Sequence, residues 1–423
     1  MQIVIHALNF HPEEVGCARY NTELALWLAR RGHRVKVVTT PPYYPWWQVQ
    51  PPYLWHQYRH ETLDNLDIYR CPLWVPRQPT GSARIWHLLS FGVSSLPYAF
   101  VPPWQGSDPQ FKPDLVFTVQ PTLFGAFSAL LMARRLQAKA WLHVQDFELE
   151  AALATRLIGL KKGGVLPIRV ANRLERFFYT RFHRLSVISR TMAQRLADKG
   201  LPEEKIVYLP NWVDTNVIRP LSRDSIMRHE LGLSISQRVV LYSGNMGRKQ
   251  GLDIILRIAP SLARSHPDLV FLLVGDGSGR ADLKADVRRR GLTNVRFAPL
   301  QPVAKLNDLL NLADLHLVLL THGVRDSVLP SKLTTILAAG GVAIASAEPG
   351  TELMQLISRH QCARAVPPED EAALRTAITS LLADSDRCRA ISAAARRLAE
   401  SQFSIDSVLP RFETQCLRYL GLS

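Results

Sequence analysis

The stretch VVLYSGNMGRKQGLD, residues 239–253, is the most informative part of this 423-residue chain for its fold. It begins as a continuous apolar run, which is typical of a parallel strand covered on both faces. Three glycines and two basic residues follow, and an apolar helical pattern comes next. A strand, a glycine-rich loop and a helix in this order predict one unit of a doubly wound sheet, in which ligands lie at the carboxyl ends of the strands.

The same alternation extends through the whole chain, so we predict an α/β protein with a parallel sheet in each half. The runs expected to form strands are 2–8, 34–40, 67–71, 114–119, 139–144, 185–189, 206–210, 239–244, 270–275, 295–298, 315–320 and 341–346. These are too many for one such sheet, and two Rossmann-like doubly wound domains facing each other across a cleft explain them better. The expected parts are a first Rossmann-like domain, a second Rossmann-like domain and a last helix that packs back on the first domain, at 1–200, 201–404 and 405–423.

The composition is that of a globular protein. It is 47% hydrophobic and 21% charged, and it contains no run of 18 apolar residues that would predict a transmembrane helix. The opening MQIVIHALNF reads as a buried strand rather than as a signal peptide. The five cysteines are scattered and form no C-x-x-C pair, which indicates a reduced, cytoplasmic protein without a zinc site or a disulfide framework.

The positive charge is concentrated in one region. Residues 1–200 hold 24 Lys and Arg against 13 Asp and Glu, and the window 156–199 alone holds 11 against 2. In that window apolar residues at helical spacing lie beside arginines, a pattern typical of a helix on an anionic membrane surface. A solvated basic face is the alternative. Nucleic acid is disfavoured, because no zinc-finger, RNP or helix-turn-helix signature is present.

Two segments interrupt the alternation. PPYYPWWQVQPPYLWHQY, at 41–58, is interpreted either as a rigid loop packed on itself or as a platform for a sugar or isoprenoid acceptor, formed by Tyr43, Tyr44 and Trp46. The segment 76–104 contains no acid and has a weakly amphipathic apolar run. It is suited to lie in a membrane interface, and a helix buried in the first domain is the alternative.

Three loops in the second half suit a phosphate. GNMGRKQG (244–251) has glycines that let backbone N–H groups approach an anion, and it carries Arg248 and Lys249. VGDGSGR (274–280) leaves room for a planar base, and PSKL (330–333) opens a helix with a hydroxyl and an ammonium. The dinucleotide G-x-G-x-x-G and the P-loop spacing are both absent, which disfavours nicotinamide, flavin and P-loop enzymes.

The chain resembles the GT-B retaining glycosyltransferases of family four along its whole length. The motifs that carry the similarity are HPEEVGCARYNTELALWLARRGHRVKVVT, YLPNWVDTNVIRP, SGNMGRKQG and PSKLTTILAAGGVAIAS. More narrowly, TTPPYYPWWQV, CPLWVPRQPT and LHVQDFE look like the colanic-acid biosynthesis sub-family, whose expected reaction is fucose transfer. The resemblance implies a metal-independent, retaining hexosyltransferase without a cofactor. Its donor would be a GDP- or UDP-linked sugar, and its acceptor an undecaprenyl-diphosphate-linked glycan. The resemblance further implies that the domain at 1–200 is membrane-proximal and binds the acceptor, and that the domain at 201–404 binds the nucleotide sugar.

The resemblance also implies which residues form the site. Lys249 and Lys332 are expected to contact the diphosphate, since catalysis by this family needs positive charge around the leaving group. Further donor-side residues are Gly16, Gly244, Asn245, Arg248, Gly275, Gly277, Leu300, Ser331, Leu333, Thr334 and Thr335. Among these, the backbone N–H groups of Gly16, Leu333 and Thr334 would complete the phosphate cradle. The acceptor-side residues are Glu13, Tyr43, Tyr44, Trp46, His143 and Gln145.

The sequence departs from the family pattern at the acidic and basic positions of the site. The two glutamates of the family's Glu-x7-Glu motif fall on Ser327 and Thr335, and neither is acidic. The usual phosphate-loop arginine falls on Asn245, with Arg248 as a possible substitute, and the usual histidine after the fifth strand falls on Gln145. These changes weaken any inference about the sugar and leave the phosphate chemistry in place.

Asp146 and Asp326 each adjoin one of the changed positions, and we expect them to take over part of the sugar-orienting and catalytic work. Two other functions fit the same motifs: a GT-B sugar-nucleotide 2-epimerase, and a non-catalytic protein that binds a nucleotide sugar or a polyanion. The aromatic loop and the basic segments favour a transferase, peripheral on the inner face of the cytoplasmic membrane, because an epimerase has no use for a lipid surface.

Overall fold

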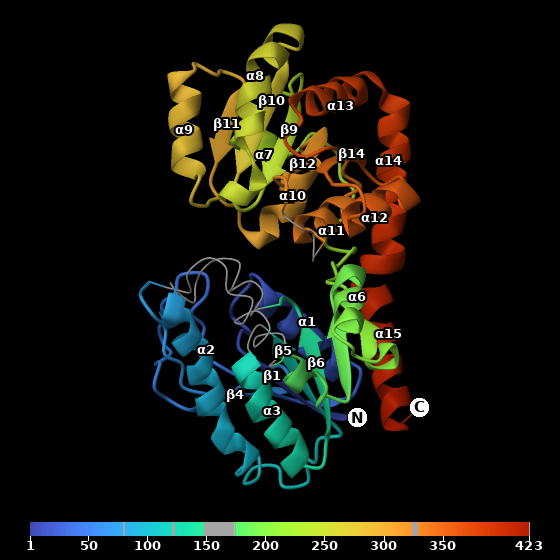
Figure 1. The fold of residues 1–423 in the computed structure, drawn as a ribbon. Coiled ribbons are helices and arrows are strands. Elements are labelled where there is room, and N and C mark those ends of the chain that lie inside the picture. Colours follow the sequence, from blue (N-terminus) through green and yellow to red (C-terminus); the bar gives the residue numbers. More distant parts are fainter. Residues whose placement is uncertain (79–80, 121–122, 148–172, 174, 324–328, 423) are drawn as a thin grey trace. The chain divides into compact units, whose positions relative to one another are not determined.

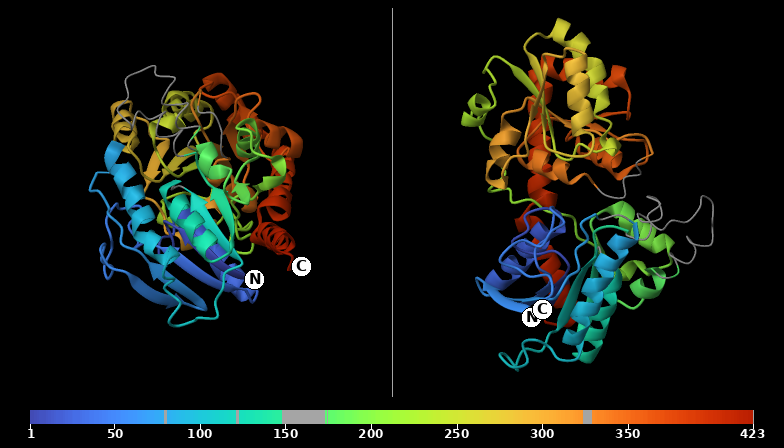
Figure 2. Two further views of the ribbon diagram at one scale, coloured as in Figure 1. Left: turned by 60° about the horizontal axis from the view of Figure 1, so that its bottom comes forward. Right: turned by 90° about the vertical axis from the view of Figure 1, so that its left-hand side faces the viewer.

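The computed structural model describes residues 1–78, 81–120, 123–147, 173, 175–323 and 329–422. The chain divides into two compact units, one formed by Met1–Pro210 with Leu409–Ser423 and the other by Asn211–Val408. Each unit is a parallel sheet with helices on its faces (Figure 1, Figure 2). The α/β class predicted from the alternation of apolar runs and helical patterns is confirmed.

The first unit contains an eight-stranded sheet in the order β3-β4-β2-β1-β5-β6-β7-β8, in which only β3 runs antiparallel to its neighbour. Its strands are β1 (Gln2–Ala7), β2 (Arg34–Thr39), β3 (Arg59–Leu63), β4 (Leu66–Arg70), β5 (Leu115–Gln120), β6 (Lys139–Val144), β7 (Arg184–Val187) and β8 (Ile206–Tyr208). The described helices are α1 (Cys17–Arg30), α2 (Gly81–Ser95), η1 (Leu96–Ala99), α3 (Leu123–Arg135), α6 (Arg190–Asp198) and η2 (Glu203–Lys205).

The second unit contains a parallel sheet in the order β11-β10-β9-β12-β13-β14. Its strands are β9 (Arg238–Ser243), β10 (Leu269–Val274), β11 (Val295–Ala298), β12 (Leu315–Val318), β13 (Ala343–Ser346) and β14 (Arg364–Val366). The helices are α7 (Ile226–Glu230), η3 (Arg248–Gln250), α8 (Asp253–Ser265), α9 (Arg280–Arg289), η4 (Val303–Lys305), α10 (Leu306–Asn311), α11 (Ser331–Ala338), α12 (Glu352–His360), α13 (Glu371–Ala383), α14 (Ser385–Leu398) and η5 (Ala399–Phe403).

Two strands were not predicted from the sequence, and both lie at the edge of a sheet. β3 has the sequence RHETL and is largely exposed, and β14 is only three residues long. Edge strands are often short and charged, so they lack the apolar run that marks a central strand. β8 pairs with β7 and therefore belongs to the first unit, which continues to Pro210, beyond the expected boundary at 200.

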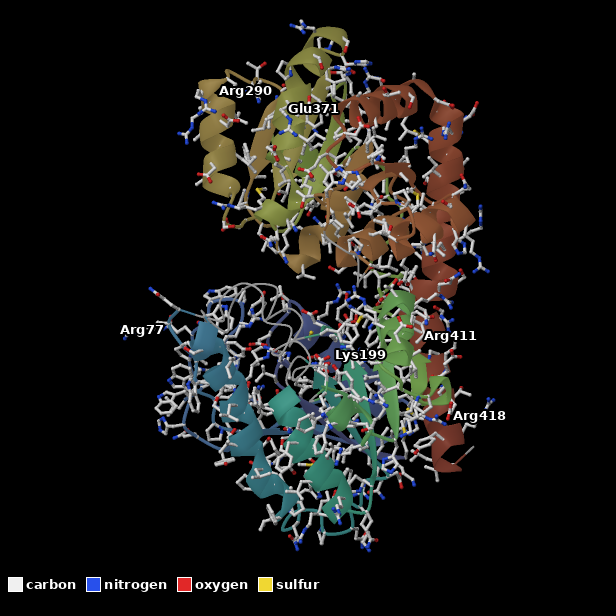
Figure 3. All side chains as sticks on the ribbon, viewed as in Figure 1. Arg77, Lys199, Arg290, Glu371, Arg411 and Arg418 are labelled. Carbon is white, nitrogen blue, oxygen red and sulfur yellow. The ribbon has the colours of Figure 1, made fainter. Side chains whose placement is uncertain are left out.

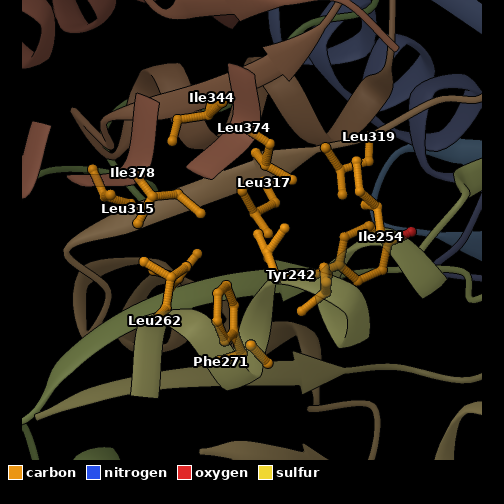
Figure 4. Packing of buried hydrophobic residues seen from close by; sticks show 14 of the residues in the cluster. Tyr242, Ile254, Leu262, Phe271, Leu315, Leu317, Leu319, Ile344, Leu374 and Ile378 are labelled. Carbon is orange, nitrogen blue, oxygen red and sulfur yellow. The ribbon is translucent and has the colours of Figure 1, made fainter. Parts of the chain in front are cut away.

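A cluster of buried hydrophobic side chains packs on one face of the second sheet and supports the strands whose carboxyl ends lead into the candidate site. It joins Tyr242 of β9 and Phe271 of β10 to Leu317 of β12, and α8 and α13 cover these side chains with Leu262 and Ile378 (Figure 4). Truncation of one such side chain to alanine typically costs about 2–5 kcal/mol. The loops that follow β9, β10 and β12 therefore start from a rigid base.

The last helix, α15 (Ile405–Leu420), begins in the second unit and continues in the first. The ring of Phe412 lies edge-on to Phe117 and Trp141, with centroid distances of 5.3 and 5.4 Å. The Glu413 carboxylate lies 2.7 Å from a ring nitrogen of His33. Residues 409–423 thus complete the core of the first unit. Among the described helices, none combines the length and the apolar character needed to cross a membrane.

Candidate active site

Three predicted site segments meet at the carboxyl edge of the second sheet. The loop after β9 starts with Gly244, the loop after β10 starts with Gly275, and α11, which follows β12, starts with Ser331. β9 lies between β10 and β12, and the chain continues outward from it in both directions. Such a point, where the strand order reverses, is the usual ligand site of a doubly wound sheet.

Glycines let the loop after β9 touch the loop after β10. A Cβ atom at Gly275 would lie 2.0 Å from the carbonyl oxygen of Gly244, and one at Gly277 would lie 2.4 Å from Oδ1 of Asn245. Both glycines also have φ angles, +137° and +147°, that side chains disfavour. The two loops therefore form one packed backbone surface on which only glycine fits at these positions.

Lys332 supplies a cation to this surface. Its Nζ lies 3.2 Å from the position that a Cβ atom of Gly244 would occupy, and 4.0 Å from the centroid of the Tyr242 ring. Burial lowers the pKa of Lys332 to about 8. Among the described ion pairs none includes this ammonium, so its stabilisation in the free protein comes from the aromatic ring. An anion beside it would restore the usual preference for the charged form.

The other basic residues of this edge lie on η3, directly after the glycine loop. The side chains of Arg248 and Lys249 are exposed and have no hydrogen-bond or ion-pair partner in the described part of the chain. The backbone oxygen of Lys249 accepts a hydrogen bond from the N–H of Thr321 at 3.0 Å, which fixes the turn. Leu300, just after β11, is exposed at the same edge.

The first turn of α11 uses one of the expected donors internally. The N–H of Leu333 donates to the carbonyl oxygen of Pro330 at 2.8 Å, and the Leu333 side chain is buried in the core. Ser331 is exposed. The hydroxyls of Thr334 and Thr335 each donate to the carbonyl oxygen three residues earlier, at 2.8 and 2.9 Å. Thr335 thus stabilises the helix, and the first turn carries no acidic side chain.

In the first unit, Glu13 connects the loop after β1 to the aromatic loop. Its buried carboxylate accepts hydrogen bonds from the backbone N–H groups of Tyr43 and Tyr44, both at 2.7 Å, and from the amide of Asn9 at 2.8 Å. Burial raises the pKa of Glu13, although these hydrogen bonds oppose the shift. Tyr43 is buried, whereas Tyr44 is exposed and Trp46 is 69% exposed. The loop is therefore anchored at one end and presents aromatic rings at the other.

Gly16 precedes α1 at the same edge. Its φ angle of +62° lies in the left-handed region, and a Cβ atom there would lie 4.0 Å from the Tyr44 ring. No side chain caps the start of α1, and its first turn contains no acid. An uncapped helix N-terminus of this kind favours an anion.

His143 is a packing residue rather than a surface group. It is buried, and its two ring nitrogens lie 2.9 Å from the hydroxyl of Ser186 and 3.0 Å from the amide nitrogen of Gln145. Burial lowers the pKa of His143 to about 3, so the imidazole is neutral near pH 7. The side chain of Asp146 is exposed beside this network.

Two family models divide the chain in the same way as the two units. Residues 15–212 match the glycosyl transferase 4-like domain, and residues 225–398 match the glycosyl transferases group 1. A protein of Escherichia coli (strain K12), named as the colanic acid biosynthesis glycosyl transferase WcaI, is 39% identical over 415 residues, which cover 97% of this chain and 98% of its own. The chain belongs to the group 1 (GT4) glycosyltransferases. The family resemblance of the sequence motifs is confirmed.

Solved structures share the fold of this glycosyltransferase. Sucrose-phosphate synthase from Thermosynechococcus elongatus has a TM-score of 0.71 at 16% identity, and the match covers 100% of both chains. Anabaena HepE in complex with UDP-glucose has a TM-score of 0.66 at 15% identity, over 100% of this chain and 99% of its own. These neighbours are GT-B glycosyltransferases with two Rossmann-like domains, as expected from the sequence.

Some predicted features of the glycosyltransferase lie outside the described residues. They are Asp326, Ser327 and the part of the basic window within 148–172 and at 174. The segment 76–104 is described almost throughout and contains α2. One side of α2 buries Phe91, and the other leaves Trp86 61% exposed. This helix is therefore packed on the first unit and still presents an apolar surface.

Sequence reasoning missed Tyr242 as a site residue of this glycosyltransferase. Its ring lies against the Lys332 ammonium, and its hydroxyl donates to the carbonyl oxygen of Asn245 at 2.5 Å. In the sequence it is an aromatic residue near the end of an apolar strand, a pattern that indicates core. Only the three-dimensional contact with Lys332 reveals its second role.

Proposed function

We propose that this glycosyltransferase transfers a sugar, most simply L-fucose from GDP-L-fucose, to an undecaprenyl-diphosphate-linked glycan in exopolysaccharide biosynthesis. The observation that carries the proposal concerns the Lys332 ammonium. It lies beside the packed backbone of the loops that start with Gly244 and Gly275, and it has no carboxylate partner among the described residues. That arrangement suits the diphosphate of a nucleotide sugar. The name of the Escherichia coli relative supports a role in exopolysaccharide synthesis.

In the proposed reaction, the bond between the anomeric carbon and the diphosphate oxygen breaks, and negative charge develops on the leaving diphosphate. Lys332, together with the exposed Arg248 and Lys249, would stabilise that charge. The acceptor hydroxyl would attack from the same face, which retains the configuration, and its proton would pass to the departing phosphate. His143 does not fit the role of a base, because it is buried and its ring nitrogens are engaged.

Asp146 is the described carboxylate that we propose to orient the sugar. It is exposed at the end of β6, where the family's histidine position falls on Gln145. Replacement Asp146→Asn removes the charge and keeps the shape. A fall in turnover or in donor affinity would support the role, and unchanged kinetics would remove Asp146 from the mechanism. Asp326 can be tested in the same way.

We also propose that the glycosyltransferase is peripheral on the inner face of the cytoplasmic membrane. The net charge of +15 and the exposed Trp86 on α2 support this. If attraction to anionic lipids contributes, salt should release the protein from membranes. Complete recovery in the soluble fraction at low salt would contradict the membrane part of the proposal.

A two-step experiment tests the function. Melting temperatures are first measured with a panel of nucleotides and nucleotide sugars, since a ligand of the folded state raises the melting temperature. The best donor is then incubated with and without a lipid-diphosphate glycan. Transfer supports the proposal, interconversion of the donor without an acceptor indicates an epimerase, and binding without turnover indicates a non-catalytic protein.

A further inference from the structure

A groove on the first unit combines an apolar wall with basic side chains. It has a volume of about 600 Å³, and no acidic residue lines it. One wall comes from α3 and the other from the helical residues 175–179 with the turn that follows. None of these residues belongs to the candidate active site.

α3 presents an apolar stripe to this groove. Phe127, Leu130, Leu131 and Arg134 occupy positions i, i+3, i+4 and i+7, which lie on one face of a helix. The two leucines are half-buried, and Phe127 is 54% exposed. Ser128 and Ala129 on the opposite face are buried. The stripe is therefore additional to the surface that α3 needs for packing.

The facing wall carries a second exposed phenylalanine on a fixed support. Phe177 is 49% exposed, and its ring is 5.5 Å from that of Phe178 in an edge-on arrangement. Two residues before Phe177, the buried carboxylate of Glu175 forms an ion pair with Lys199. Lys199, the C-cap residue of α6, is labelled in Figure 3. Exposed phenylalanines on two facing elements indicate a contact surface rather than isolated exposed side chains.

Three cations line the same groove. No ion pair among the described residues engages Arg134, Lys139 or Arg181. The Arg181 guanidinium lies over the Phe177 ring, 3.3 Å from its centroid, and donates to the Phe177 carbonyl oxygen at 2.7 Å, which fixes its direction. His183 adds no charge, because burial and the neighbouring Lys139 lower its pKa and its Nδ1 accepts a backbone N–H.

The groove lies at the amino edge of the first sheet. Lys139 begins β6 and His183 precedes β7. Glu13, Tyr44 and Gln145 instead follow the carboxyl ends of β1, β2 and β6. The groove is thus a separate feature from the surface where a sugar would react.

We propose that this groove binds the acyl chain and the anionic headgroup of a membrane phospholipid and thereby holds the glycosyltransferase on an anionic bilayer. The proposal deepens, and rests on, the membrane location in the proposed function. An apolar stripe that ends in cations, with no acid in its lining, is complementary to an anionic amphiphile. Arginine suits the headgroup, since its planar fork binds a phosphate through two N–H groups.

The test is co-sedimentation of the full chain with vesicles of phosphatidylcholine alone, or of phosphatidylcholine mixed with phosphatidylglycerol. The wild type should bind the mixed vesicles more tightly. The double variants Phe127→Ser/Phe177→Ser and Arg134→Gln/Arg181→Gln should each bind them about tenfold more weakly, because each removes one of two signals needed for stable attachment. Unchanged binding of both variants would overturn the proposal.

Matched controls separate the groove from general surface effects. Ile226→Ser removes a side chain that is 79% exposed on the second unit, and Arg289→Gln removes an exposed cation there, so both should bind as the wild type does. Trp86→Ser tests the rival surface on α2. If Trp86→Ser abolishes vesicle binding and the groove variants do not, α2 rather than the groove is the docking surface.

Two further measurements on the groove variants complete the design. The melting temperatures of the groove variants should match that of the wild type. A large fall in melting temperature together with unchanged vesicle binding would show that other residues of this chain pack in the groove, which contradicts the proposal. The rise in melting temperature with the donor should persist in all variants. A loss of vesicle binding with normal donor binding supports the proposal. If the wild type binds no nucleotide sugar, that result contradicts the proposed function. Vesicle binding by the wild type and the variants then still tests the groove by itself.

Discussion

The carboxyl edges of the two sheets use polar side chains in opposite ways. In the second unit, two glycine loops expose their backbone, and the Lys332 ammonium has no carboxylate partner in the described residues. In the first unit, Glu13 and His143 are buried and engaged in hydrogen bonds within the unit. We infer that the second edge supplies the charge for chemistry, and that the first edge is a rigid support for the exposed Tyr44 and Trp46.

The largest effect should come from Gly275→Ala, because the new Cβ atom would lie 2.0 Å from the Gly244 oxygen in a backbone conformation that side chains disfavour. We expect a loss of more than about 3 kcal/mol in stability, with loss of the donor-induced rise in melting temperature. Gly291→Ala is the matched control, since its φ angle is +62° and nothing lies within 4 Å of the new atom. It should cost about 1 kcal/mol. Equal thermal stability of the two variants would show that the contact between the loops is not required.

Lys332→Gln should remove the main positive charge of the second edge without unfolding it. We expect kcat/KM for the donor to fall about 100-fold, equivalent to about 2.7 kcal/mol of transition-state stabilisation. The melting temperature should stay the same or rise, because a partly buried ammonium is removed. Lys305→Gln, at an exposed lysine of the same unit that pairs with Glu230, should leave the kinetics unchanged. A normal kcat/KM in the Lys332→Gln variant would contradict the inference that the carboxyl edge of the second sheet supplies the charge for chemistry.

The pH dependence of donor binding should also come from the second edge. The pKa of Lys332 is lowered to about 8, so the free protein loses this charge as the pH rises through that value. A bound diphosphate favours the charged form, and donor affinity should therefore fall above pH 8, by up to about tenfold per pH unit. His143 contributes nothing there, because its pKa is about 3. Calorimetric titration between about pH 6.5 and 9.5 measures the slope, and the profile of Lys332→Gln should be flatter.

The smallest effect is expected at Tyr242. Tyr242→Phe keeps the ring beside Lys332 and loses the hydrogen bond to the Asn245 oxygen, so donor affinity should stay within a few-fold of the wild type. Tyr242→Leu removes the ring, and the pKa of Lys332 should fall further, which shifts the decline in donor affinity to lower pH. Identical pH profiles for the two variants would show that the ring does not stabilise the ammonium.

Much of the fold could be predicted because central parallel strands carry continuous apolar runs. That the glycine loops and Lys332 lie at one edge of the second sheet could also be predicted, since segments that follow neighbouring parallel strands meet there. Their contact with a phosphate stays a prediction. The state of His143 could not be predicted, because its partner Ser186 lies opposite it on β7 through strand pairing that a single sequence does not contain. The role of Tyr242 was hidden for a similar reason, as a core residue and a ring beside a cation look the same in sequence.

The path of α15 has a consequence for the biosynthesis of the protein. Phe412 packs on Phe117 and Trp141, so the first unit contains side chains from both ends of the chain. During translation, that unit cannot complete its core until residues 409–423 have left the ribosome, although the rest of it is made first. The first unit is therefore completed only after the whole second unit has emerged.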